Sequence, residues 1–251
     1  MNSQSAAPAN EALCASLLNA TLIKSVPLSS SVHHLIFRVE SEEMLEFLPG
    51  QSICIELPIQ GGSSPSPYSI ASAPRSDNCF ELCLRRGTKG SPAARLCELN
   101  EGMRVKSTRP KGVFVLHQPA GDTVFLAAGT GIAPIRSMLH WLLKKNDRHP
   151  DAKIYLIFGA RESESLLFHR EFLQLAQQHS NFHYLPTLSR PEPHWNGACG
   201  YVQDHLHRLP LRPESTHAYL CGPAAMIKNV RETLDQQGWP DNLVHYERHE
   251  S

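Results

Sequence analysis

The sequence predicts two domains of different architecture, an antiparallel β-barrel or sandwich followed by a doubly wound α/β sheet. Three observations lead to this prediction. The 251 residues are enough for two domains of ordinary size, each with its own core. Short strands broken by Gly, Pro and Ser fill the chain up to about residues 117–122. After Gly121 the pattern changes to apolar strands that alternate with helices.

The first half contains three segments in which apolar and polar residues alternate, at 32–40, 52–57 and 80–85. In the first of them Leu35, Phe37 and Val39 fall on one face, as in a strand with one buried side. Turn-forming residues separate the segments, most densely at 61–67. This combination is typical of an antiparallel barrel or sandwich.

The second half is predicted to contain parallel strands with helices between them. The strands are expected at 123–128, 153–158, 182–187 and 217–221. The helices are expected at 134–145, 166–178 and 224–237. The last helix has an apolar residue at every fourth position (Met226, Val230 and Leu234), and Gly238 follows it as a stop signal.

The composition argues against several classes of partner. Lys plus Arg and Asp plus Glu both number 24, so no net charge attracts nucleic acid or anionic lipid. The hydrophobic fraction is 41%, and no apolar run is long enough to span a membrane. Residues 1–10 hold no basic residue before an apolar segment, so no secretory signal is predicted. We therefore expect a cytoplasmic protein without nucleic-acid or membrane partners.

The cysteines and histidines do not predict a metal site. The seven cysteines include no C-x-x-C pair, which argues against zinc ribbons and iron–sulfur clusters. Their odd number suits a reducing cytoplasm, where thiols stay free. His33 and His34 are adjacent and His205 and His207 are two apart, without supporting carboxylate or cysteine spacing. We expect these histidines to lie in solvent or to support other side chains.

The most informative stretch is 125–134, with the sequence F-L-A-A-G-T-G-I-A-P. Gly129 and Gly131 permit a tight turn after an apolar strand, and Pro134 suits the first turn of a helix. A helix N-terminus behind such a turn presents free N–H groups and a positive dipole end, which favour a diphosphate. Taken alone, the pattern also fits a turn that is tight only for packing.

Seven short motifs follow one another along the chain. They are Pro49-Gly-Gln51, Pro67-Tyr-Ser-Ile-Ala-Ser72, Gly90-Ser-Pro92, Arg109-Pro-Lys-Gly-Val-Phe114, Gly129-Thr-Gly-Ile-Ala-Pro134, Phe158-Gly-Ala-Arg161 and Cys221-Gly-Pro-Ala-Ala-Met226. In this order they resemble the ferredoxin–NADP reductase superfamily, from about residue 18 to the end. The resemblance implies an N-terminal six-stranded antiparallel β-barrel that binds flavin and a C-terminal NAD(P)-binding α/β domain with a doubly wound parallel sheet. We expect a flexible tail at 1–17, the flavin domain at 18–119 and the NAD(P) domain at 120–251.

The resemblance places a flavin, FAD or FMN, against the second motif. Tyr68 would stack on the ring or its ribityl side, Ser69 would hydrogen-bond near the reacting N5 atom, and Ile70 continues the same segment. Gly90 and Ser91 resemble the turn that binds the flavin phosphates through backbone N–H groups. On the residues alone, the less favoured alternative for Tyr68 is a strand aromatic, and Gly90-Ser91 could equally be a simple hairpin turn.

One position departs from the family, because Ser66 stands where the superfamily has an arginine that pairs with flavin phosphate. Serine offers a neutral hydrogen bond in place of a charge-assisted one, a loss on the order of 1.5–3 kcal/mol or roughly 10- to 100-fold in affinity. Arg85, Arg86 and Lys89 are candidate replacements, although solvated charges at a strand end are common. We therefore expect loose flavin binding, or flavin that behaves as a substrate.

The resemblance assigns the nicotinamide dinucleotide to the second domain. Its diphosphate would contact the glycine turn, through Gly129, Thr130, Gly131 and Pro134. Cys221 would lie beside the nicotinamide and help to orient its C4 atom for hydride transfer, so Ser69 and Cys221 are the predicted catalytic residues. The same motif adds Gly222, Pro223 and Met226 to the cofactor site. On the residues alone, Cys221 could be a buried structural thiol.

Three further residues follow the second and third strands of this domain, where the superfamily recognises the adenosine ribose: Arg161, Ser189 and Arg190. Arginine and serine there can bind a 2′-phosphate and so favour NADPH. Glu162 and Glu164 nearby could instead suit the 2′-hydroxyl of NADH.

The C-terminal segment 244–251 resembles the last strand of the superfamily, which often ends in an aromatic residue that covers the flavin. His249 stands at about that position, and Tyr246 is interpreted as a strand residue. The far face of the flavin is therefore expected to be less well shielded.

The resemblance implies an oxidoreductase that transfers hydride from NAD(P)H to FAD and passes electrons to a separate ferredoxin or oxygenase-type protein. Two alternatives stay open on the sequence. The protein could be a flavin reductase that uses free flavin as a loosely bound substrate, or a non-catalytic regulatory subunit that keeps the fold.

Overall fold

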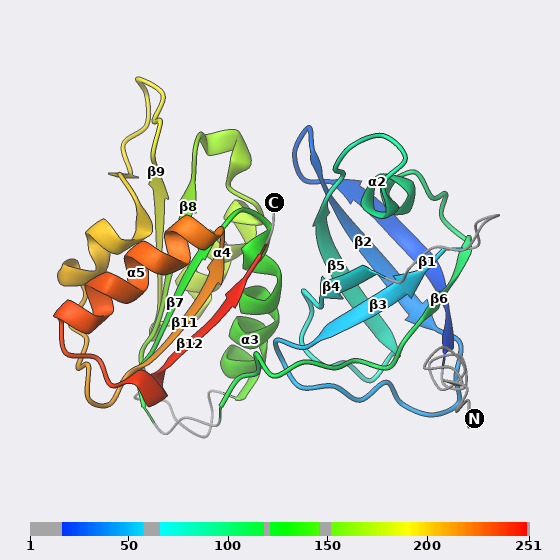
Figure 1. Cartoon of the computed structure of the whole chain (residues 1–251), viewed down its shortest axis with the longest axis horizontal. Coiled ribbons are helices and arrows are strands. Elements are labelled where there is room, and N and C mark those ends of the chain that lie inside the picture. The colour runs from blue at the N-terminus through cyan, green and yellow to red at the C-terminus, as the bar shows by residue number, and fades with distance from the viewer. Residues whose placement is uncertain (1–16, 58–65, 118–120, 146–151, 250–251) are drawn as a thin grey trace, which may run out of the picture.

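The computed structural model of the chain describes residues 17–57, 66–117, 121–145 and 152–249. The predicted tail at 1–17 lies almost wholly outside the described residues, as does the predicted domain boundary between residues 119 and 120. Figure 1 shows two bodies side by side, one built mainly of strands and the other of a sheet with helices packed on it.

The N-terminal body is an antiparallel sheet that curls into a barrel (Figure 1). Its strands are β1 (Leu18–Pro27), β2 (Val32–Val39), β3 (Ser52–Glu56), β4 (Ser66–Ser69), β5 (Cys79–Arg85) and β6 (Arg104–Ser107), in the order β4-β3-β6-β1-β2-β5. The outer strands meet just beyond β4, where Ile70 pairs with Leu82 and the Ala71 N–H donates to the Glu81 carbonyl at 2.7 Å. The predicted six-stranded barrel is confirmed, and a short helix α2 (Pro92–Cys97) buries Leu96 in its core.

Strand β5 is buried on both faces, whereas its alternating pattern predicts a single buried face. Phe80, Leu82 and Leu84 belong to the barrel core. The opposite face carries Cys83, which joins the core of the second body, and Glu81, which is only 6% exposed. The prediction of one exposed face is wrong because the second domain covers this side of the barrel.

The second body contains a six-stranded sheet in which all neighbouring strands of the described residues pair in parallel. The strands are β7 (Thr123–Ala128), β8 (Ile154–Ala160), β9 (Phe182–Leu188), β10 (Ala198–Cys199), β11 (His217–Gly222) and β12 (Val244–Arg248), in the order β10-β9-β8-β7-β11-β12. The helices are α3 (Ile132–Lys145), α4 (His169–Gln178) and α5 (Ala224–Gln236). Helix α4 begins three residues later than predicted, because Phe168 before it has a left-handed φ of 56°. The predicted stop of α5 is confirmed, since Gly238 has a φ of 78°.

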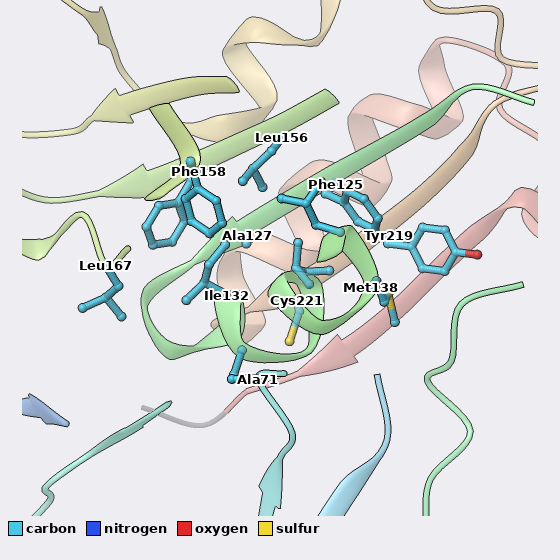
Figure 2. Packing of buried hydrophobic residues seen from close by; sticks show 14 of the residues in the cluster. Ala71, Phe125, Ala127, Ile132, Met138, Leu156, Phe158, Leu167, Tyr219 and Cys221 are labelled. Carbon is cyan, nitrogen blue, oxygen red and sulfur yellow. The ribbon is translucent and has the colours of Figure 1, made fainter. Parts of the chain in front are cut away.

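Helices cover both faces of this parallel sheet, as the doubly wound prediction requires (Figure 1). Helices α3 and α4 pack on the face that carries Phe125, Leu156 and Phe158. Helix α5 and a 3-10 helix at Val202–Arg208 pack on the other face. Figure 2 shows the first of these cores, which also contains Ala71 from the barrel, so the two domains share one apolar cluster. Within the described part of the chain, no helix has the length and apolar character needed to cross a bilayer.

Several histidines are packed against other groups, and His205 takes the supporting role that the sequence allows. His205 is 1% exposed, and its Nε2 atom lies 2.9 Å from the Thr187 hydroxyl. A second group lies near the N-terminal ends of β11 and β12, at the end of the sheet opposite the glycine turn. There the rings of His117, His217 and His245 stack, with centroids 4.4 Å (His117–His245) and 5.3 Å (His217–His245) apart. A contact of 3.0 Å joins His217 Nδ1 to His245 Nε2. Burial, with the nearby His117 and His217, lowers the pKa of His245 to about 4.

This histidine stack predicts a loss of stability in mild acid. His245 has an ordinary pKa of 6.5 when unfolded and about 4 when folded, so the unfolded chain binds more protons between these values. Stability is therefore full above about pH 6.5 and falls as the pH decreases towards 4. We expect His245→Phe to reduce the drop in Tm between about pH 7.5 and pH 5 by roughly 2–4 °C, which corresponds to about 1 kcal/mol after allowance for partial exposure. Thermal melts of His207→Phe, at an exposed site, provide the control, and an unchanged drop in His245→Phe would contradict the prediction.

Candidate functional site

Residues of the two domains converge where the barrel meets the carboxyl ends of β11 and β12. Ser69, at the end of β4 and 7% exposed, donates its hydroxyl to Glu247 Oε1 at 3.3 Å. Glu247 lies beside Cys221 in the parallel register of β12 and β11. The structure thus brings the two predicted catalytic residues, Ser69 and Cys221, to the same junction through a carboxylate between them.

Glu247 is a candidate site residue that the sequence patterns do not identify. In the C-terminal strand the sequence patterns point only to His249 and Tyr246. Burial raises the pKa of the Glu247 carboxyl, and the hydrogen bond from Ser69 opposes that rise. Among the described residues no cation forms an ion pair with Glu247. The Ser69–Glu247 hydrogen bond is long, and the Glu247 carboxyl is half-buried without a cationic partner among the described residues. Both groups can therefore form further hydrogen bonds with a ligand at the domain junction.

Cys221 is completely buried, and burial raises the pKa of its thiol well above the ordinary value, with Glu247 adding to the rise. The thiol is therefore neutral at physiological pH and cannot serve as a nucleophile or base. In Figure 2 its side chain points to the side of the cluster on which Ala71 of the barrel lies. The position allows Cys221 to shape and orient a neighbouring ring.

The glycine turn has the tight geometry that the sequence predicts. Gly129 takes a left-handed φ of 57° with open space around its Cα, which leaves the turn accessible. A side chain at Gly131 would collide with the carbonyl oxygen of Cys221, so this glycine lets the turn pack against β11. Thr130 is 5% exposed, and its hydroxyl lies 3.1 Å from His249 Nδ1. Pro134 follows inside the first turn of α3.

The rest of the Cys-Gly-Pro motif joins the same place. Pro223 precedes α5 as its N-cap residue, and a side chain at Gly222 would meet the Met226 sulfur at 2.8 Å. The His249 N–H donates to the Gly222 carbonyl at 3.0 Å, which extends the β12 pairing past Arg248. Both strand ends and the glycine turn therefore form one continuous backbone surface.

On the barrel side, Tyr68 and Ile70 flank Ser69. Ile70 is fully buried and contributes to barrel closure, so its side chain supports the site from within the core. Tyr68 is half-buried against the barrel core, and the neighbouring Ser66 hydroxyl opposes the effect of burial on its pKa. Burial raises the pKa of Tyr68. Ser66 therefore stands beside the predicted flavin-stacking ring.

The predicted phosphate turn lies beside α2. Gly90 has a φ of 84°, and the Ser91 hydroxyl accepts a hydrogen bond from the Ala94 N–H as the helix cap. Arg85 is exposed and donates to the Ser31 hydroxyl at 3.3 Å, while Arg86 pairs with Glu98. These exposed cations stand near the turn in sequence, and the contact of Arg85 is weak enough to exchange for a phosphate.

Arg161, Ser189 and Arg190 are brought together at the carboxyl ends of β8 and β9. The Arg190 N–H donates to the Arg161 carbonyl at 2.8 Å, and the Ser189 N–H donates to the Ala160 carbonyl at 3.0 Å. Both arginine side chains are exposed, and within the described residues neither forms an ion pair. The cluster is positively charged and free to contact an anion.

The two candidate residues of the C-terminal segment, Tyr246 and His249, lie in different surroundings. Tyr246 is 42% exposed with the Arg231 guanidinium 4.5 Å above its ring, so it faces away from the junction. His249 instead contacts Thr130, and burial lowers its pKa, so it is neutral at physiological pH. Of the two, His249 is the residue positioned beside the glycine turn.

Two family models match the chain, one for each domain. The oxidoreductase FAD-binding domain matches residues 19–116, and the oxidoreductase NAD-binding domain matches residues 125–232. The described residues fit both FAD and a nicotinamide dinucleotide, because a hydroxyl, a carboxyl and a thiol meet at the junction between an aromatic segment and the glycine turn.

The chain is similar to reductases over nearly its whole length. It is 34% identical over 240 residues to ferredoxin–NADP reductase B of Sorangium cellulosum, which covers 92% of this chain and 97% of that protein. It is 26% identical to the anthranilate 1,2-dioxygenase electron transfer component of Acinetobacter baylyi and 31% identical to the phenol hydroxylase P5 protein of Acinetobacter pittii. The chain spans 66% and 64% of the lengths of these last two proteins.

A solved structure has the same fold. A ferredoxin NADP+ reductase from Neisseria gonorrhoeae with bound FAD and NADP matches 93% of this chain and 99% of that chain, with a TM-score of 0.81 and 20% identity. Fold, paired domains and a relative matched over almost its full length lead to one conclusion: the chain belongs to the ferredoxin–NADP reductase superfamily and is an NAD(P)H-dependent flavoprotein oxidoreductase that uses FAD.

Proposed function

We propose that this protein takes hydride from NADPH and delivers the electrons through FAD to a separate ferredoxin or oxygenase-type protein. The observation that carries the proposal is the contact of Ser69 with Glu247 beside Cys221, because it joins the flavin segment of one domain to the nicotinamide strand of the other. The relatives named as a ferredoxin–NADP reductase and as an electron transfer component support it.

The proposed roles follow from position. Tyr68, Ser69 and Ile70 hold the flavin ring, and Gly90, Ser91 and Arg85 hold its phosphates. The residues proposed to bind the nicotinamide dinucleotide are Gly129, Thr130, Gly131, Pro134, Cys221, Gly222, Pro223 and Met226. When bound, FAD accepts a hydride, two electrons with one proton, from the nicotinamide and passes the electrons onward. Apart from that chemistry the chain supplies alignment: Ser69 and Glu247 offer polar contacts at the junction, and the neutral Cys221 shapes the ring pocket.

A second candidate function is reduction of free flavin, and one observation favours it. Position 66 holds a serine that lies beside Tyr68, so no charged side chain stands at the usual phosphate-binding position. A third candidate, a non-catalytic subunit, is disfavoured because the glycine turn and the Cys221 strand retain the packing that a dinucleotide needs.

A retention and turnover experiment separates the three. The purified protein is dialysed extensively, and its flavin absorbance is measured before NADPH oxidation is followed with a ferredoxin, with ferricyanide and with added FMN. We expect retained FAD and rapid reduction of ferredoxin without added flavin. A colourless protein that turns over only with FMN would support the flavin reductase, and no NADPH oxidation under any condition would leave only the regulatory role.

Replacing Ser66 tests the weak point of the flavin site. We expect Ser66→Arg to bind FAD roughly 10- to 100-fold tighter, because a charge-assisted contact to phosphate replaces a neutral one. Fluorescence titration of the apoprotein with FAD gives the Kd. Ser66→Ala, which removes the Tyr68 contact without adding charge, is the matched control and should show no gain. Equal affinity of wild type and Ser66→Arg would mean that another group already holds the phosphate.

The exposed arginine cluster predicts a preference for NADPH over NADH. We expect Arg161→Ala and Arg190→Ala each to raise KM for NADPH by roughly tenfold or more, since each removes a charge-assisted contact to the 2′-phosphate. KM for NADH should change little, because NADH lacks that phosphate. Arg104→Ala, at a 75% exposed site on the barrel, is the control. Parallel changes for both cofactors would refute the assignment and favour Glu162 or Glu164 as ribose ligands.

A further inference from the structure

Arg136 is a buried cation at the boundary between the two domains. It lies in α3, five residues after Gly131 of the glycine turn, and is 8% exposed. Figure 1 shows α3 on the side of the parallel sheet that faces the barrel. The Arg136 guanidinium also lies 4.6 Å above the ring of Phe168. Helix α3 therefore holds a buried charge between the glycine turn and the neighbouring domain.

The contacts of α3 with the barrel reach the backbone just beyond Ser69. Arg136 Nη1 donates to the Ala71 carbonyl at 2.8 Å, and Ser137 donates its hydroxyl to the Ser72 carbonyl at 2.6 Å. Ala71 is two residues after Ser69, in the segment that carries Tyr68. Helix α3 thus joins the segment just after Ser69 to the end of the glycine turn by a short path.

Two carboxylates from different domains fix the orientation of the guanidinium. Arg136 Nη1 donates to Glu81 Oε2 of the barrel at 2.8 Å. Nε and Nη2 of Arg136 donate to the two oxygens of Glu171 in α4 at 2.8 and 2.9 Å. This two-point contact with Glu171 holds the plane of the guanidinium, which a lysine could not reproduce.

Glu81 is itself held by the barrel. Its carboxylate contacts His34 at 2.9 Å and Arg75 at 2.8 Å, and its backbone N–H donates to the Ser72 hydroxyl at 3.1 Å. The same residue therefore binds both Arg136 and the segment that Arg136 contacts. Displacement of the guanidinium would be transmitted directly to residues 71 and 72.

We propose that Arg136 is a positioning residue for hydride transfer, which sets the separation of the flavin segment from the dinucleotide turn; this inference rests on the proposed function. Arg136 touches neither ring. It acts through the Ala71 carbonyl and Glu81 on the barrel side, and through α3 on the side of the glycine turn. Hydride transfer between two bound rings depends steeply on their separation, and a displacement of about 1 Å can cost on the order of 100-fold in rate.

The test compares Arg136→Met, Arg136→Lys and Ser137→Ala with the wild type, all loaded with saturating FAD. Stopped-flow absorbance measures the rate of flavin reduction by NADPH and by NADPH deuterated at C4. We expect Arg136→Met to slow this step by roughly 10- to 100-fold with less than about a threefold change in the Kd for NADPH. Arg136→Lys should recover part of the rate, and Ser137→Ala, which keeps the buried charge, should show a smaller loss.

A second readout does not depend on turnover. Hydrogen exchange followed by mass spectrometry should show faster exchange of the peptide that contains Ala71 and Ser72 in Arg136→Met, with FAD present or absent. Leu143→Ala is the structural control: Leu143 is buried in the core that α3 shares with the sheet, at the far end of the same helix. It should lower Tm without changing the reduction rate or exchange at Ala71.

The outcomes are distinguishable. If Arg136→Met lowers Tm as Leu143→Ala does but reduces flavin at the wild-type rate, the proposal is overturned and Arg136 is only a structural contact. If the wild type itself fails to reduce FAD, the proposed function is refuted, and with it this inference. If Arg136→Met does not fold, Arg136→Lys and Ser137→Ala decide, and wild-type rates in both overturn the proposal.

Discussion

The arrangement of the two domains depends on one buried guanidinium, that of Arg136. A buried charge is tolerated only when it is paired and fully hydrogen-bonded, and Glu81 and Glu171 provide this from opposite sides. Burial by itself would raise the pKa of Glu81, but the His34 hydrogen bond and the charge of Arg136 together lower it to about 2. Removal of one partner from such a group typically costs about 3–5 kcal/mol, so the domains have a strong preference for this one orientation.

This orientation places the chemical groups of the junction. The glycine turn lies against β11 because Gly131 has no side chain to collide with the Cys221 carbonyl, and α3 leads from that turn to the barrel. Ser69 and Glu247 then meet across the boundary. With a neutral thiol and a carboxyl of raised pKa, the junction holds no strong nucleophile. Alignment of two rings is the catalytic task that such a site can perform.

At Ser66 of the flavin domain, the resemblance to the superfamily and the geometry of the structure give different information. Comparison with the superfamily treats Ser66 as the loss of a phosphate-binding arginine. In the structure Ser66 contacts Tyr68, which lies two residues along the same strand and on the same face. The weak contact of Arg85 with Ser31 leaves a cation near the Gly90 turn available for phosphate. Ser66 therefore adjoins the predicted flavin-stacking ring as well as lacking the charge of an arginine.

Local patterns in the sequence determined the strand–turn–helix unit at 123–145, the stop of α5 at Gly238 and the barrel strands with alternating residues, because each depends on neighbours within a few positions. Ser69 and Cys221 are instead predicted through the resemblance of short motifs to the superfamily. Tertiary structure alone decided which distant residues meet. Glu247, 178 residues from Ser69, could not be found by spacing. Arg136 reads as an ordinary helix residue, and β5 reads as a strand with one exposed face. Their burial arises only when the second domain covers the barrel, since the environment of a charge is set by what packs over it and not by the residues beside it in the chain.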